Sequence, residues 1–251
     1  MTSQQADATV GRSTNGAAAE IAEWRTHTRV FLQPIAAPSV LGLFGFAAAT
    51  FMVTAHLVGW YGNAKSPGLI FPFAVAAGGI AQGAAALFAY KARDPLATAI
   101  HGIWAAFWLA YGLLNLLVVA KALPTPPPHG PVPELGYWFF ALAAITAAGM
   151  LASLGENLAI TSVLAPLWVG AALLGVFYVV GGTGWEKAGG YVTMASSFTA
   201  FYAASAMMLA GAWGRTVLPI GKYRKDANVP GGRAMYPLEF ELGEPGVKQG
   251  Q

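Results

Sequence analysis

Two histidines are the only side chains inside the long apolar stretches of this sequence whose charge can change near neutral pH. They are His56 and His101, and each lies within about two turns of the end of its stretch. If the protein moves a solute together with a proton, these residues are the candidates for proton coupling. Hydrogen bonding at a membrane interface and ligation of a haem by the pair are the alternatives.

No pattern typical of a catalytic centre accompanies the histidines. The apolar stretches contain no pair of carboxylates, no Ser-His-Asp arrangement and no Glu-x-x-His sequence that would bind a metal. The chain has no cysteine, which excludes disulfides, thiolate metal sites and thiol catalysis. We therefore expect a protein that is not an enzyme and has no resident metal or cofactor.

Three neutral polar residues within the stretches, Thr54, Gln82 and Asn115, are candidates for binding a solute. A polar side chain in hydrocarbon needs a hydrogen-bond partner, which a passing solute, a water or a neighbouring helix can supply. Asn115 ends an aromatic series on one helical face that begins at Trp104, and such a series also arises from simple packing. The sequence leaves the solute path and the packing role open for all three.

The composition requires these residues to lie on membrane-spanning helices. The 251-residue chain is 56% hydrophobic and 10% charged, with a mean hydropathy of +0.53, which is too apolar for a soluble globule. We predict an all-α integral membrane protein, a bundle of six transmembrane helices of about 20 residues each. The expected spans are Pro38 to Trp60, Leu69 to Tyr90, Leu96 to Ala120, Gly136 to Leu154, Leu158 to Val180 and Gly190 to Trp213.

The flanking regions complete the expected domain organisation. Residues 1–16 resemble a disordered tail without a signal peptide, 17–33 an amphipathic helix on the membrane surface, 34–221 the six-helix domain and 222–251 a flexible tail. Most of the Lys and Arg lie on the side of the membrane that holds both ends of the chain, so we expect both termini to be cytoplasmic. The net charge of +3 is small and spread over ends and loops, which argues against a nucleic-acid partner.

Several separate motifs, in order, resemble one family. The combination is similar to the acetate uptake transporters, also called succinate–acetate permeases or YaaH-like proteins. Its motifs here are PSVLGLFGF from Pro38, HLVG at 56–59, GGIAQ at 78–82, AFWL at 106–109 and GRTVLPIG at 214–221. The resemblance covers all six spans and leaves the two tails unmatched.

The resemblance implies a homohexamer in the inner membrane, in which each protomer carries acetate, related short carboxylates or succinate as an anion channel or a proton-coupled permease. The family's path narrows at a Phe, a Tyr and a Leu, which correspond to Phe46, Trp104 and Leu167. Trp104 therefore departs from the family pattern, and so do Ala37 and Val40 in the opening motif. Around this constriction, Thr54, Gln82, Trp104 and Asn115 would replace the water of a passing acetate.

Two further hypotheses stay open at this stage. The path could carry another small solute such as ammonia, for which an aromatic lining would also serve. The protein could instead be a membrane scaffold that transports nothing and whose basic tail binds a partner. The resemblance favours transport, because it runs through the spans and fades in the tails.

Overall fold

A computed structural model of the chain describes residues 35–63 and 65–221. The expected surface helix at 17–33 and both expected tails lie outside the described residues. Within the described part, six helical spans are long and apolar enough to cross a bilayer. They are α2 (Pro38–Leu57), the continuous segment α3 (Ser66–Ala74), η1 (Val75–Ala81) and α4 (Gln82–Ala92), then α5 (Pro95–Val119), α6 (Pro133–Ser153), α7 (Leu158–Val180) and α8 (Thr183–Trp213). The six predicted spans are confirmed as helices.

The last helix begins earlier than its predicted start at Gly190. Gly181 and Gly182 have φ values of 76° and 99°, a conformation that glycine adopts at no steric cost, so the chain turns there and a new helix starts at Thr183. Glu186 therefore lies in the first turn of α8, where its Oε2 is 2.5 Å from Nδ1 of His129. This pair joins the long connection after α5 to the start of α8.

Local sequence fixes where α5 begins. Asp94 is its N-cap residue, and the carboxylate accepts a 2.8 Å hydrogen bond from the backbone N–H of Ala97. Pro95 follows at the first helical position, where the missing N–H costs nothing. The Asp-Pro sequence thus places a carboxylate at the end of the third span.

The start of α7 is held by two parts of the chain. Asn157 caps it through a 3.0 Å bond from the N–H of Ile160 to the side-chain carbonyl. The N–H groups of Leu158 and Ala159 donate to the carbonyls of Gly221 and Ile220, at 2.8 and 2.9 Å. The GRTVLPIG segment after α8 therefore returns to satisfy the exposed donors at this helix end.

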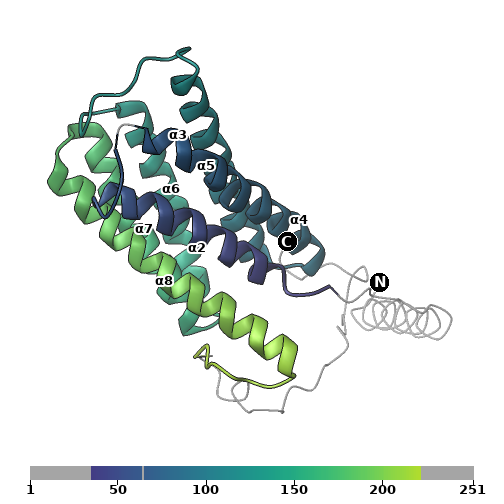
Figure 1. Cartoon of the computed structure of the whole chain (residues 1–251). Helices are drawn as coiled ribbons and strands as arrows, with labels where there is room; N and C mark the ends of the chain where they lie inside the picture. The colour runs from purple at the N-terminus through teal and green to yellow at the C-terminus, as the bar shows by residue number, and fades with distance from the viewer. Residues whose placement is uncertain (1–34, 64, 222–251) are drawn as a thin grey trace, which may run out of the picture. The chain divides into compact units, whose positions relative to one another are not determined.

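The spans pack in a closed circle. α6 packs against α7, α7 against α8, and α8 against α2, which lies alongside it in Figure 1. α2 in turn packs against the second span, the second span against α5, and α5 makes a lighter contact with α6. The largest buried apolar cluster draws on α2, α3, α5, α6, α7 and α8, so the core lies inside this circle.

α7 continues through Pro166, which has no N–H to donate to the carbonyl of Ser162 one turn earlier. The hydroxyl of Thr199 on α8 lies 2.9 Å from this carbonyl and equally close to the carbonyl of Ser196, so its one proton can be shared with the carbonyl that Pro166 leaves without a donor. Next to it, Ser196 donates to the carbonyl of Val163 at 2.7 Å. Two hydroxyls of α8 therefore support α7 immediately before Leu167.

Candidate functional site

The three predicted constriction residues lie in one buried cluster. Phe46, Trp104 and Leu167 are only 2%, 2% and 1% exposed. The rings of Phe46 and Trp104 meet edge to face, with centroids 6.0 Å apart and an interplanar angle of 74°. Each residue lies between two and three turns inside its helix, about 12–14 Å from the first residue. We call these three residues the constriction; in this structure their side chains are closed to solvent.

Trp104 is held in place by a residue that sequence reasoning missed. Its indole Nε1–H donates a 3.1 Å hydrogen bond to Oγ1 of Thr146 on α6, and Thr146 donates in turn to the carbonyl of Leu142 at 2.7 Å. Thr146 is fully buried. No signal in the sequence distinguishes it from any other Thr on a span. Because its only hydrogen-bond donor is engaged, Trp104 presents an apolar surface to the other two residues, Phe46 and Leu167.

The other polar candidates differ in whether their own helices supply a hydrogen-bond partner. The Thr54 hydroxyl donates to the carbonyl of Thr50 at 2.7 Å, and the Asn115 amide donates to the carbonyl of Tyr111 at 2.8 Å. Gln82 is 1% exposed, and its Oε1 has no hydrogen-bond partner in the described part of the chain. A buried amide oxygen of this kind is normally satisfied by a water or a ligand, so Gln82 is the strongest binding candidate of the three.

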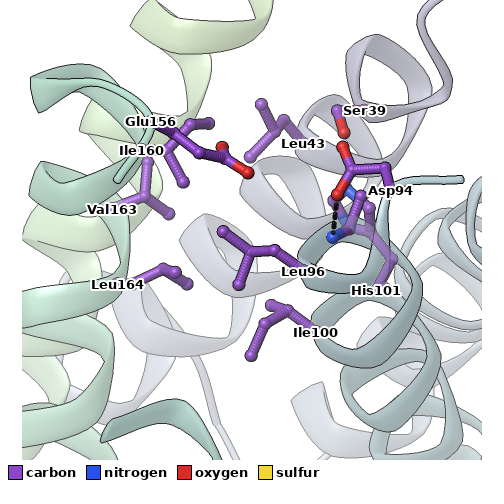
Figure 2. Close-up of a pocket in the computed structure, with 11 residues that line it drawn as sticks. Ser39, Leu43, Asp94, Leu96, Ile100, His101, Glu156, Ile160, Val163 and Leu164 are labelled. Carbon is purple, nitrogen blue, oxygen red and sulfur yellow. Dashed lines mark hydrogen bonds between the residues drawn. The ribbon is translucent and has the colours of Figure 1, made fainter. Parts of the chain in front are cut away.

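A pocket opens one turn before the constriction, on the side where α2, α5 and α7 begin (Figure 2). We call it the mouth pocket. It is small, with a cavity volume of about 40 Å³, which is room for a few water molecules. Its innermost apolar residues, Leu43, Ile100 and Leu164, each lie three or four positions before a constriction residue on the same helix. The mouth pocket therefore lies about one turn away from the three predicted constriction residues.

Four polar residues line the mouth pocket: Ser39, Asp94, His101 and Glu156. Figure 2 shows the carboxylates of Asp94 and Glu156 entering it from opposite sides. None of the described residues that line it is Lys or Arg. A second pocket beside it shares Ser39 and both carboxylates and extends to Ile220. The sequence analysis did not select either acid, although each lies at or just before the start of an odd-numbered span.

The two predicted histidines lie near opposite ends of α2. His56 belongs to α2, and His101 belongs to α5 and packs beside the start of α2. His101 is 5% exposed and lines the mouth pocket, with its ring against the backbone of Gly42. His56 is half-buried in the last turn of α2, where Nδ1 is 3.2 Å from the carbonyl of Tyr61. Gly42 and His56 are about 20 Å apart along the helix, so the two imidazoles do not form a common site. Among the described residues no group of three or more His, Cys, Asp or Glu is placed to hold a metal.

Nδ1 of His101 has no hydrogen-bond partner among the described residues. A neutral imidazole carries one N–H and one lone pair, so this nitrogen is either a donor or an acceptor without its complement. The site thus combines a closed apolar constriction with a polar pocket that contains one unsatisfied imidazole nitrogen.

Comparisons with known proteins identify relatives of this chain. The sequence model of the GPR1/FUN34/yaaH family matches residues 24–219. The succinate-acetate/proton symporter SatP of Escherichia coli K12 and that of Shigella flexneri are each 29% identical over 188 residues, which cover 75% of this chain and 96% of theirs. The solved structure of the bacterial acetate channel SatP is 29% identical, with a TM-score of 0.66 over 75% of this chain and all of that one. These relatives are named as a symporter and a channel, not as enzymes.

Proposed function

Because this chain belongs to the GPR1/FUN34/yaaH family, we propose that it carries acetate and related short carboxylates, succinate included, across a membrane. The resemblance drawn from separate motifs is confirmed by the family match, which runs through every span. The observation that carries the proposal is the mouth pocket that ends at the buried constriction.

The solute enters through the mouth pocket and passes between Phe46, Trp104 and Leu167. These side chains are apolar on the surfaces they present, so a solute loses part of its water there. The side-chain amide of Gln82 carries N–H donors as well as its unsatisfied oxygen, and a donor is what a carboxylate needs in place of that water. The constriction contains no Lys or Arg to bind an anion tightly, which suits rapid release.

We place both termini in the cytoplasm, with residues 17–33 on the membrane surface. The mouth pocket then faces the cytoplasm, because it lies where α2, α5 and α7 begin. Lys91 in the last turn of α4 and Arg93 just before α5 support this orientation. The bacterial relatives support the inner membrane as the location. We propose a homohexamer in which every protomer has its own path.

The test is uptake of labelled acetate and succinate into liposomes that contain the purified chain, minus the uptake of empty liposomes. The wild type is expected to exceed the background for both, and Leu167→Ala is expected to admit larger acids. Leu142→Ala is the matched control, since it removes an equally buried leucine from α6 and should leave the size limit unchanged. An unchanged size limit in both Leu167→Ala and Trp104→Ala would refute the constriction. Dependence on an imposed pH gradient separates a symporter from a channel.

A second candidate, transport of ammonium or another small cation, is favoured by one observation: two carboxylates line the mouth pocket. Opposite charge would attract a cation to that position. Competition decides between the two candidates. Propionate should reduce labelled acetate uptake and ammonium should not; the reverse result would support the cation.

A further inference from the structure

We propose that the segment after α8, residues 214–221, is a lid on the mouth of the path. In its docked position the segment keeps the solute out, and the solute binds only where the segment is released. We call these residues the lid segment. The inference rests on the proposed function and deepens it, because it names the element that controls access to the mouth pocket.

The lid segment turns back from the end of α8 and docks on the start of α7 (Figure 1). Gly214, with a φ of 64°, ends α8. At the other end the carbonyl of Gly221 accepts a 2.8 Å hydrogen bond from the N–H of Leu158. The carbonyl of Ile220 accepts one of 2.9 Å from the N–H of Ala159. Gly221 also has a φ of 64°, and a Cβ added to it would lie 2.8 Å from Cβ of Leu158, so the docked position requires glycine there.

Ile220 brings the lid segment into the mouth. Its side chain lines the second pocket together with Ser39 and Asp94, and it packs against the largest apolar cluster. The mouth pocket and the second pocket have cavity volumes of about 40 and 80 Å³. Small-molecule sites begin at about 300 Å³. A carboxylate that keeps part of its water therefore needs more room than the docked Ile220 leaves.

The lid segment is the part of this lining that is displaced most easily. The other residues that line the second pocket belong to the spans or to the two positions before one. The lid segment is held instead by the two hydrogen bonds to α7 and by a third, in which the hydroxyl of Tyr202 donates to the carbonyl of Pro219 at 2.7 Å. Pro219 and Gly221 are exposed. A segment with few buried contacts and exposed hydrogen bonds opens at a lower free-energy cost than a packed helix.

Docking of the lid segment and entry of the solute exclude each other, so only the released fraction of the protein can bind. The apparent affinity is then reduced by that fraction. Weakening the docked state should lower the acetate concentration that gives half-maximal flux. Maximal flux and the size limit, which depend on the constriction, should not change. Loss of one hydrogen bond should shift the equilibrium toward release about 2- to 10-fold.

The first test is acetate flux in liposomes at pH 7.5 over a range of concentrations, after subtraction of the empty-liposome background. Leu158→Pro removes the N–H that donates to Gly221. Proline is favoured at this first helical position, and the extended Asn157 before it, with φ −165° and ψ 159°, is compatible with a following proline. Leu158→Ala is the matched control, because it also removes the leucine side chain but keeps the N–H. The half-saturating concentration should be 2- to 10-fold lower in Leu158→Pro than in Leu158→Ala, at equal maximal flux.

A second pair of variants acts on the other anchor. Tyr202→Phe removes the hydroxyl that donates to Pro219 and should lower the half-saturating concentration in the same way. Tyr191→Phe is its control on the same helix, at a similar exposure of 50% against 41%, and should change nothing.

Thiol labelling measures release of the lid segment without transport. The chain has no cysteine, so Ile220→Cys introduces a single thiol. In detergent, a maleimide should react with this thiol several times faster in a Leu158→Pro background than in a Leu158→Ala background, because release exposes it.

The inference is overturned if Leu158→Pro and Leu158→Ala have equal half-saturating concentrations, if the thiol reacts equally fast in both backgrounds, or if release changes the size limit. With any of these results, wild-type acetate flux above the background leaves the proposed function standing and removes only the lid. Absence of wild-type flux at every concentration would remove the proposed function and the lid together.

Discussion

Replacing Thr146 by Val tests how the constriction is built. Val has nearly the shape of Thr but cannot accept the indole N–H of Trp104, whose hydrogen bond is 3.1 Å long and fully buried. An unsatisfied buried donor costs about 1–3 kcal/mol. The carbonyl of Leu142 loses only a second bond from the Thr146 hydroxyl, so most of the cost belongs to the indole.

At about 2–4 °C per kcal/mol for a protein of this size, Thr146→Val should lower Tm by roughly 2–12 °C. Tryptophan fluorescence during heating in detergent measures this directly. Thr146→Ser keeps the hydroxyl and is the matched control, with a smaller loss. Without its anchor the indole can rotate, so Thr146→Val should also loosen the size limit for carboxylates in liposomes, and Thr146→Ser should not.

A double-mutant cycle isolates the hydrogen bond. In a Trp104→Phe background there is no indole N–H to satisfy, so Thr146→Val should cost at least 1 kcal/mol less than it does beside Trp104. An equal cost in both backgrounds would show that Thr146 acts through packing alone. Wild-type stability of Thr146→Val beside Trp104 would refute the hydrogen bond as a stabilising contact.

Two further substitutions test the helix ends and the mid-helix proline. Thr199→Val should lower the free energy of unfolding by about 1 kcal/mol, because it removes a donor to the carbonyl of Ser162. Most of this loss should vanish in a Pro166→Ala background, where a backbone N–H returns. Thermal unfolding of the wild type, the two single variants and the double variant measures the difference. Asp94→Asn keeps the N-cap of α5, so Tm should hold. It removes a negative charge worth about 0.7 kcal/mol to an anion at ~6 Å in a water-like dielectric, so acetate binding at pH 7.5 should tighten about threefold; unchanged binding would contradict an effect of Asp94 at the mouth.

Much of this arrangement was predictable from the sequence, because hydrophobic length determines the spans and the motifs place Phe46, Trp104 and Leu167 at one depth. The convergence of Asp94 and Glu156 was also within reach: odd-numbered spans of a six-helix bundle begin on the same side. Thr146 was not predictable, since its role depends on a tertiary contact across 42 residues. Nothing in the local pattern showed that η1, which packs against α2 and α5, adopts a π-helix.

The two halves of the proposed path make different demands on a carboxylate. The mouth pocket has a polar lining, whereas the proposed constriction beyond it offers three apolar surfaces. A carboxylate can keep part of its water at the mouth but loses it at the constriction, where burying a charge without a partner is costly. On this path the main barrier therefore lies at Phe46, Trp104 and Leu167, so substitutions there, rather than at the mouth, should change the size limit.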